Sequence, residues 1–329
     1  MGEKIEKELK WAVLGTGVIA NEMAQALEKM GKKLYAVANR THGKAVEFAK
    51  KYGVQKVYDK IEDMFTDKET DIIYITTPHN THIKFMIEAL KNGKHVLCEK
   101  SITLNSEELE EAVKIAKEKN LILGEAMTIF NMPLYTELSE IVNSGKLGDV
   151  RMIQVNFGSY KEYDMNNRFF NRNLAGGALL DIGVYAISIT RLFMTSKPDN
   201  VLSQVKYAPT GVDEQASIIM MNKEQQMSTI ALTLHSKQPK RVVIACEKAY
   251  IEITEYPRAD KAKIVYTETG EIEEITAGMT ANALQYELQN MEESVKTGIN
   301  KMKLEYTIDV MDIMTKLRKE WGMTYPEEE

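Results

Sequence analysis

Apolar residues in the first third of the chain occur in short runs that alternate with helical spacing. Residues 11–14 form an unbroken apolar run before Gly15, which is typical of a strand buried on both faces of a parallel sheet. After Gly17, apolar residues recur at steps of three and four from 19 to 30, as on the buried face of a helix. Gly31 then suits the left-handed position that ends a helix. The pattern therefore predicts a strand, a glycine turn and a helix in succession.

The same alternation continues to about residue 124. Asn105 can cap a helix, and Glu108 follows three residues later, as in a capping box. Alternation of this kind builds a doubly wound parallel sheet with helices on both faces. The further predicted strands are 33–38, 57–58, 71–76, 95–98 and 121–123, and the predicted helices are 45–52, 82–91 and 106–119.

Beyond residue 124 strand-like runs follow one another with little helix between them. Consecutive strands joined by short polar turns imply an open, mostly antiparallel sheet. The predicted strands are 152–160, 217–221, 228–234, 241–245, 250–254 and 263–267, and the predicted helices are 134–144, 178–194, 284–296 and 304–321. The chain is thus predicted to be an α/β protein of two domains, 1–124 and 125–329, with no flexible linker between them.

The composition of the chain disfavours some classes of binding partner. A chain of 329 residues favours about two domains, and 42 basic against 48 acidic residues give a net charge of −6. This charge disfavours nucleic acid or an anionic membrane as the main partner. Cys98 and Cys246 are too few for a disulfide framework. The first ten residues are charged and resemble no secretory signal, and we expect no span able to cross a bilayer. The expected location is the cytoplasm.

The glycine turn is the first candidate site. Gly15-Thr16-Gly17-Val18-Ile19-Ala20 has the G-x-G-x-x-A spacing of a dinucleotide fingerprint. The glycines permit a sharp turn and close approach of a pyrophosphate, and the helix start offers unpaired N–H groups. Such a loop can also be a tight turn without a ligand. Because a strand precedes it and a helix follows, we expect the first five of these residues to bind a dinucleotide cofactor.

The end of the second predicted strand bears on which cofactor is used. An NAD-preferring site places a carboxylate there for the ribose 2′-OH. This chain has Asn39, Arg40 and Thr41 instead. A guanidinium matches a phosphate, so Asn39 and Arg40 favour NADP over NAD. The alternative is that Arg40 is an ordinary solvated surface residue.

The loop after the fourth predicted strand contains Thr77, Pro78, His79, Asn80 and His82. In open α/β sheets the ligand crevice lies beyond the carboxyl ends of the strands, so we expect these residues to border the cofactor. Capping of the loop is the alternative role. The two histidines could begin a metal site, but no neighbouring Cys or carboxylate completes one, so no metal is expected.

Lys100, Asp181 and Tyr185 could handle protons. Glu99 and Lys100 follow the fifth predicted strand at the same crevice, so we expect both to contact the cofactor, although most exposed lysines are chemically inert. Asp181 and Tyr185 lie four residues apart on a predicted helix within an apolar run. Polar groups in such surroundings need partners or a function. The alternative is a loop-capping Asp and a core Tyr.

Together these motifs resemble the glucose-fructose oxidoreductase, inositol dehydrogenase and MocA family over nearly the whole chain. The resemblance implies a Rossmann domain, then an α/β domain whose open sheet forms a homodimer or dimer of dimers, with a C-terminal helix able to pack back on the first domain. It implies hydride transfer between NAD(P) and a sugar, polyol or dihydrodiol. It rests on 15–20, on Thr77-Pro78, on Gly93-Lys94-His95-Val96-Leu97-Cys98-Glu99-Lys100 and on Gly176-Gly177-Ala178-Leu179-Leu180-Asp181-Ile182-Gly183-Val184-Tyr185.

By this resemblance Lys100 matches the catalytic lysine of a Glu-Lys-Pro motif. Ser101 replaces the proline, so a less rigid loop is expected. Many relatives have His at the position of Tyr185. A Tyr at this position resembles the subgroup that contains dihydrodiol dehydrogenase and NADP-dependent xylose dehydrogenase. Residues 128–133 lack the Arg and His that relatives often carry, so the substrate of any one relative does not transfer.

The implied mechanism gives each residue a role. Tyr185 transfers the hydroxyl proton, and Lys100 lowers the phenol pKa from its usual value near ~10 and hydrogen-bonds the same oxygen. Asp181 binds another substrate hydroxyl or orients Lys100. Arg168, Phe169 and Phe170 border the substrate, or are ordinary loop residues. Two alternatives remain: a non-catalytic NAD(P)-binding regulator of the same family, and a reductase of a non-sugar substrate.

Overall fold

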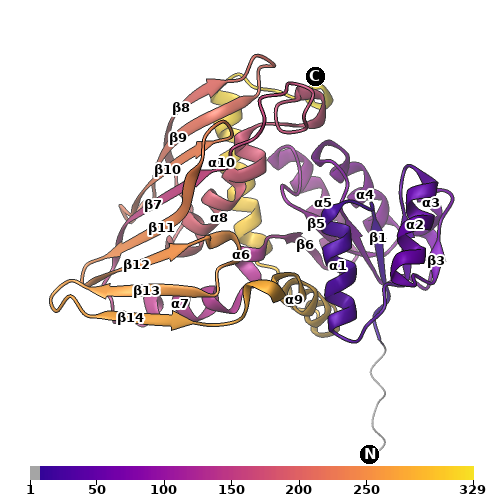
Figure 1. Cartoon of the computed structure of the whole chain (residues 1–329), viewed down its shortest axis with the longest axis horizontal. Coiled ribbons are helices and arrows are strands. Elements are labelled where there is room, and N and C mark those ends of the chain that lie inside the picture. The colour runs from indigo at the N-terminus through magenta and orange to yellow at the C-terminus, as the bar shows by residue number, and fades with distance from the viewer. Residues whose placement is uncertain (1–7) are drawn as a thin grey trace, which may run out of the picture.

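The structure is a computed structural model that describes residues 8–329. Seven of the ten residues considered for a secretory signal lie outside the described residues. Figure 1 shows two sheets side by side, with helices on both faces of the smaller sheet and along one face of the larger. The predicted fold class, a doubly wound parallel sheet followed by a large, mostly antiparallel one, is confirmed.

The first sheet is wholly parallel and has the strand order β3-β2-β1-β4-β5-β6. This is the doubly wound order of a dinucleotide-binding fold. The second strand is shorter than predicted and the sixth begins two residues later. The strands are β1 (Trp11–Leu14), β2 (Ala36–Ala38), β3 (Lys56–Val57), β4 (Ile72–Ile75), β5 (His95–Glu99) and β6 (Leu123–Ala126).

The helices of this part end as their sequences predict. Gly31 and Gly53 adopt φ values of 71° and 62° behind α1 and α2. Asn105 accepts from Glu108 N, but the Glu108 carboxylate accepts from Leu104 N rather than from Asn105 N, so the box is shifted by one residue. The helices are α1 (Val18–Lys29), α2 (His42–Tyr52), α3 (Ile61–Thr66), α4 (His82–Lys91) and α5 (Ser106–Glu118); α3 was not predicted.

The second sheet has eight strands in the order β14-β13-β12-β11-β7-β10-β9-β8. All neighbours are antiparallel except β7 and β10, which run parallel. Two of its strands, β8 and β14, were not predicted. The strands are β7 (Val150–Gly158), β8 (Asn200–Tyr207), β9 (Asp213–Met221), β10 (Met227–Thr233), β11 (Gln238–Cys246), β12 (Ala249–Thr254), β13 (Lys261–Tyr266) and β14 (Ile272–Thr276).

Helices cover one face of this sheet, and its other face is open (Figure 1). The open face carries exposed apolar side chains on several strands: Leu202, Ile219, Met227, Tyr250 and Ile272. The helices are α6 (Thr128–Asn131), α7 (Pro133–Asn143), α8 (Val184–Phe193), α9 (Ala283–Thr297) and α10 (Leu304–Glu320), of which α6 was not predicted.

The long predicted helix 178–194 is not α-helical throughout. Its first turn, Leu179–Gly183, is a π-helix that continues directly into α8. The segment Arg172–Phe193 is long and apolar enough to pass a composition test for a membrane span, so the expectation that no segment would do so is wrong. In its most apolar stretch of 18 residues, 83% is buried inside the protein, as in a core helix.

The last two long helices return to the first sheet. Trp11 Nε1 in β1 donates to Glu292 Oε1 in α9 at 3.0 Å. Thr307 Oγ1 in α10 donates to Glu125 Oε2 in β6 at 3.0 Å. These contacts join the two sheets through the C-terminal part of the chain. Because β6 also extends to Ala126, the division of the chain at residue 124 stays a prediction.

Candidate active site

The glycine turn after β1 has the shape that a bound pyrophosphate requires. Gly15 has φ +114°, and a Cβ at this position would clash with the side chain and carbonyl of Thr76. A Cβ on Gly17 would meet no atom within 4 Å, so the backbone there borders open space. Gly15 is therefore needed for the fold of the turn, and Gly17 leaves room for a ligand to approach the backbone.

The start of α1 is open to an anion. Its N-cap residue, Gly17, makes no side-chain capping bond, and the first turn of this helix contains no acidic residue. Val18 is 80% exposed at this point. Asn21 Nδ2 donates to Gly17 O at 2.8 Å and steadies the turn from behind. The free N–H groups and the helix dipole fit a phosphate group.

The end of β2 presents Arg40 to solvent. Asn39 Nδ2 donates to Thr41 O at 3.1 Å, which fixes the turn into α2. Asp59, after β3, lies 3.1 Å from His42 Nε2 and is largely exposed. Within residues 8–329 the Arg40 side chain forms no ion pair, and its predicted contact with the cofactor stays a prediction.

The loop after β4 is tied to the loop after β5 through two histidines. His79 Nε2 lies 3.0 Å from Lys100 O. His82 is fully buried, with Nδ1 3.0 Å from Ser101 O and Nε2 2.7 Å from Thr77 O. Burial lowers the pKa of both rings, for His79 to about 3 with help from His82 and Lys100. The prediction that His82 contacts the cofactor is wrong, because the enclosed ring holds the loops together instead.

The other residues of this loop are engaged more loosely. Thr77 Oγ1 accepts from Thr81 Oγ1 at 2.8 Å, and Pro78 is exposed. Asn80 Nδ2 donates to Asn173 O at 3.3 Å and to the carboxylate of Glu327. Among residues 8–329, no group of three or more His, Cys, Asp or Glu side chains is arranged to hold a metal ion.

Lys100 and the start of α8 meet across the crevice. Lys100 Nζ donates to Asp181 O at 2.7 Å and lies 3.4 Å from Asp181 Oδ1. It also lies over the Tyr185 ring, 4.8 Å from the centroid. The side chains of Lys100 and Asp181 are only 15% and 10% exposed. The structure therefore brings together the ammonium, carboxylate and phenol that the sequence nominated from two distant segments.

The π-helical turn supplies the carbonyl groups for this contact. Ser101 is fully buried, and its Oγ donates to Leu180 O at 2.9 Å beside the Lys100–Asp181 bond. The peptide between Lys100 and Ser101 is cis. A proline in place of Ser101 could not donate this bond. Ser101 thus anchors the loop that carries Lys100. The expectation of a less rigid loop did not take this hydrogen bond into account.

The glycine pair before the π-helical turn permits close packing. A Cβ on Gly176 would clash with the carbonyl groups of residues 168–169, and Gly177 has φ +125°. A Cβ on Gly177 would clash with Asp213, whose Oδ2 accepts from Leu179 N at 2.6 Å. Burial raises the pKa of Asp213 to about 7. The buried carboxyl group, from β9, holds the first turn of the helix in place.

The electrostatics differ from the sequence prediction at Tyr185. Burial opposes ionisation of Asp181, but Lys100 and Arg168 outweigh it and hold the pKa of Asp181 below its usual range. Asp181 in turn keeps the pKa of Lys100 raised despite burial. Burial raises the pKa of Tyr185, and the Lys100 cation offsets this only in part. The prediction that Lys100 brings the pKa of the Tyr185 phenol below its ordinary value is therefore wrong.

Phe169 and Phe170 were both predicted to border the substrate, but the structure places them in different surroundings. Phe170 is fully buried and packs edge-on against Tyr163, with ring centroids 5.2 Å apart, so its predicted contact with substrate is wrong. Phe169 instead faces the site, with the Arg168 guanidinium 4.1 Å from its centroid. Arg168 lies 3.6 Å from Asp181 Oδ1, which agrees with its predicted place beside the site.

Sequence reasoning missed several residues around Tyr185. Phe157 packs against the Tyr185 ring at a centroid distance of 6.0 Å, and Lys240 Nζ lies 5.4 Å from the Phe157 centroid. Lys161 Nζ lies 4.2 Å from the Phe169 centroid. Phe157 lies in β7, Lys161 in the loop after β7 and Lys240 in β11. Their spacing in the sequence does not indicate that they lie close to the site.

Glu99 is directed toward the sheet. It accepts a hydrogen bond from the Tyr74 hydroxyl, and burial raises the pKa of the Glu99 carboxyl. Burial also raises the pKa of the neighbouring Glu125 to about 7. Glu125 Oε1 accepts from Ile102 N at 3.1 Å, so this carboxyl group supports the loop that follows Lys100. The cofactor contact predicted for Glu99 stays a prediction.

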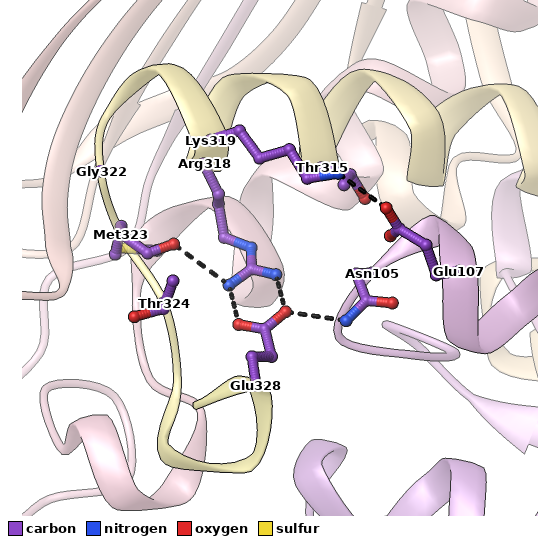
Figure 2. A pocket seen from close by; sticks show the side chains of 9 residues that line it. All are labelled: Asn105, Glu107, Thr315, Arg318, Lys319, Gly322, Met323, Thr324 and Glu328. Carbon is purple, nitrogen blue, oxygen red and sulfur yellow. Dashed lines mark hydrogen bonds and ion pairs between the residues drawn. The ribbon is translucent and has the colours of Figure 1, made fainter.

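The C-terminal residues form a second contact between the two parts of the chain. Figure 2 shows the pocket at the end of α10, where Arg318 donates to both carboxylate oxygens of Glu328 at 2.8 and 2.6 Å. Glu328 Oε1 also accepts from Asn105, the cap of α5, at 2.8 Å. The described lining of this pocket includes none of the predicted site residues. Its charges pair with one another, which indicates a structural clasp.

Comparison with known proteins agrees with this geometry. Residues 9–127 match the family described as "Oxidoreductase family, NAD-binding Rossmann fold", and residues 135–252 match the "GFO/IDH/MocA C-terminal domain". A trans-1,2-dihydrobenzene-1,2-diol dehydrogenase of Xenopus laevis is 30% identical over 96% of this chain and 99% of its own length. The chain belongs to the GFO/IDH/MocA oxidoreductase family.

Other relatives of this GFO/IDH/MocA protein extend the comparison. The human trans-1,2-dihydrobenzene-1,2-diol dehydrogenase is 26% identical over 97% of this chain and 99% of its own. The structure of KijD10, a 3-ketoreductase from Actinomadura kijaniata with NADP and TDP-benzene, matches with a TM-score of 0.84 at 18% identity, covering 95% and 98% of the two chains. The structure of levoglucosan dehydrogenase with NADH and levoglucosan matches with a TM-score of 0.83 at 16% sequence identity, and it covers the same shares of the two chains.

As a member of the GFO/IDH/MocA family, the protein is an NAD(P)-dependent oxidoreductase. The residues of the crevice fit such a cofactor. The turn at Gly15 is open toward the start of α1, and Gly17 leaves the backbone accessible. Lys100 directly follows the carboxyl end of β5 and lies over the Tyr185 ring, at the edge of the sheet where open α/β folds bind their ligands.

Proposed function

We propose that the protein transfers a hydride between the nicotinamide C4 of NADP and the carbinol or carbonyl carbon of a sugar, polyol or trans-dihydrodiol. The observation that carries this proposal is the position of Lys100 Nζ, 2.7 Å from Asp181 O and 4.8 Å from the Tyr185 centroid. A carbinol at this point would contact a cation, a phenol and a carboxylate. The full-length similarity to dihydrodiol dehydrogenases supports the same class of substrate.

The cofactor would rest on residues 15–19 with its pyrophosphate at the start of α1, and Thr77, Pro78, His79, Asn80 and Glu99 would border it. When bound, it supplies or accepts the hydride. Arg40, exposed at the end of β2, would bind a ribose 2′-phosphate, which supports a preference for NADP over NAD.

Tyr185 would exchange the proton of the reacting oxygen. Burial raises the pKa of its phenol, so the residue is protonated at neutral pH and is prepared to donate to a carbonyl oxygen during reduction. Lys100, held charged by Asp181, would stabilise the negative charge that develops on the same oxygen. In the oxidative direction Tyr185 would have to lose its proton first, and its phenolate would then accept the carbinol proton while Lys100 remains a charged hydrogen-bond donor.

Asp181 would keep Lys100 charged and oriented, because it contacts the ammonium through both its main-chain and carboxylate oxygens. Its carboxylate is 10% exposed and can also accept a hydrogen bond from a second substrate hydroxyl. An enzyme built in this way favours substrates with adjacent oxygens, such as sugars and vicinal diols.

We further propose a cytoplasmic homodimer, or a dimer of dimers, joined through the open face of the eight-stranded sheet. The exposed apolar side chains of that face, among them Leu202 and Ile219, support this proposal. These two residues lie opposite each other on β8 and β9, so they form one apolar patch.

A direct test combines cofactor binding with a substrate panel. NADPH bound to the protein should show shifted fluorescence, and aldoses, polyols and trans-diols supplied with NADP+ should include compounds that produce NADPH. A protein that binds NADPH tightly but turns over no member of a broad panel in either direction would instead be a non-catalytic regulator.

A further inference from the structure

Cations outnumber carboxylates around Phe169 and Asp181. Lys161 Nζ and Arg168 Cζ lie 4.2 and 4.1 Å from the centroid of the same ring, Phe169, so the two charges are within about 8 Å of each other. Arg168 in turn lies 3.6 Å from Asp181 Oδ1. The row of contacts leads from Lys161 to the residues that surround the reacting carbinol.

The available carboxylates do not balance these charges. Asp181 Oδ1 is shared by Lys100 at 3.4 Å and Arg168 at 3.6 Å. Lys240, above Phe157, is paired with Glu255 at 2.9 Å, and this carboxylate is 69% exposed. Within residues 8–329, no carboxylate forms an ion pair with Lys161, although its side chain is partly buried. Glu99 also attracts Lys100, but it is buried and hydrogen-bonded to Tyr74, so among the described residues Lys161 and Arg168 have only Asp181 as a nearby carboxylate.

The imbalance destabilises the Lys161 ammonium. Burial lowers the pKa of Lys161. The nearby charges of Arg168, Lys100 and Lys240 lower the same pKa further, and only Asp181 raises it. A partly buried cation among like charges gains most from an added anion, because its attraction to that anion is poorly screened. The planar guanidinium of Arg168 also suits two oxygens of one anionic group.

We propose that the physiological substrate carries an anionic group, a carboxylate or a phosphate, which binds between Lys161 and Arg168 over the Phe169 ring. This inference rests on the proposed function and specifies its substrate. The carbinol carbon contacts Lys100 and Tyr185, and the anionic group lies toward Phe169 on the far side of Asp181.

The test uses matched compounds that share one sugar ring: D-glucose, D-glucuronate and D-glucose 6-phosphate. Binding of each to the protein with NADPH already bound is measured by the change in NADPH fluorescence, at low and high NaCl. Turnover with NADP+ is measured for the same compounds. The variants are Lys161→Met, which keeps an unbranched apolar stem, and Lys91→Met as the control. Lys91 is exposed at the C-terminal end of α4, and this end of the helix is the one away from His82 and the site.

The expected result is that at least one anionic compound binds about 10-fold or more tightly than D-glucose, and that NaCl or Lys161→Met removes most of the difference. Comparison of the uronate with the phosphate identifies the kind of anion. Equal binding of all three compounds, or an anion preference that Lys161→Met leaves intact, overturns the inference. Failure of the proposed function gives a different result, namely no turnover of any compound whatever the binding measurement shows.

Discussion

Lys100 Nζ donates a 2.7 Å hydrogen bond to the main-chain oxygen of Asp181 and lies 3.4 Å from Oδ1 of the same residue. One contact depends on the backbone of the π-helical turn and the other on a charge, so mutation can separate them. The first fixes the position of the ammonium, and the second controls its ionisation. The π-helical turn thus serves the site directly, as such turns often do.

Asp181→Asn should separate these effects. The main-chain acceptor remains, but loss of the carboxylate removes the main influence that raises the pKa of Lys100 against burial. The ammonium should then deprotonate at lower pH, and the alkaline limb of the kcat/KM profile should move to lower pH. The measurement is that profile for wild type, Asp181→Asn and the surface control Asp199→Asn. A profile unchanged in Asp181→Asn would show that Lys100 does not titrate in the reaction.

Arg40→Asp should change cofactor preference. The exposed guanidinium would be replaced by a carboxylate that repels a 2′-phosphate but accepts a hydrogen bond from a 2′-OH. The KM for NADP should rise about 10-fold or more, by loss of a charge-assisted contact, while the KM for NAD stays level or falls. Steady-state kinetics with both cofactors measures this, with exposed Lys119→Asp as control. Equal effects on both cofactors would remove Arg40 from the site.

Glu125 should make the protein less stable as pH rises toward neutrality. Burial raises its pKa to about 7 in the folded state, so it retains a proton that the unfolded chain loses near about 4.3. The stability contribution of the neutral form is complete below about 4.3 and is lost as pH rises through about 7. Glu125→Gln should flatten this decline, as measured by urea midpoints between pH 5 and pH 8.

Two observations would check the Glu125 account. Glu111→Gln, an exposed change on α5, should keep the wild-type decline. Asp213, whose pKa burial also raises to about 7, should leave a residual decline in Glu125→Gln. If the pH dependence of Glu125→Gln equals that of wild type, the Glu125 carboxyl group is not protonated in the folded protein.

Gly177→Ala should destabilise the start of the π-helical turn. The residue has φ +125°, and its Cβ would displace Asp213 from Leu179 N. A loss of about 1–3 kcal/mol or more in the free energy of unfolding is expected from the strain and the broken cap. Gly270→Ala is the matched control, since it also has positive φ (+69°) but no atom within 4 Å of its Cβ. Similar losses in both variants would assign the effect to φ alone.

The sequence predicted those parts of the fold that depend on local pattern. The run 11–14 became β1, and the predicted helix 82–91 has the observed bounds of α4, because periodicity and flanking glycines mark both. Short or weakly patterned elements such as α3 and β8 were missed. At Leu179–Gly183 the spacing suggested an α-helix, but contacts with Ser101 and Asp213 accompany a wider turn.

The same limit applies to the site. Lys100, Asp181 and Tyr185 were found because each lies in a motif, and the structure brings them together. Lys161 and Lys240 lie in no motif, and only the tertiary fold brings Lys161 near Asp181 and places Lys240 over Phe157. Burial removed His82 from the predicted set, since no sequence pattern tells an enclosed ring from an exposed one.

The most direct test of the account is single-turnover reduction with prebound NADPH in wild type, Tyr185→Phe and Lys100→Ala, using the best substrate of the panel. If these residues handle the proton of the reacting oxygen, each variant should reduce the rate roughly 100-fold or more while the Kd for NADPH stays within about twofold. Tyr207→Phe, on the outer strand β8, should behave as wild type. A wild-type rate in Tyr185→Phe or Lys100→Ala would contradict the central claim.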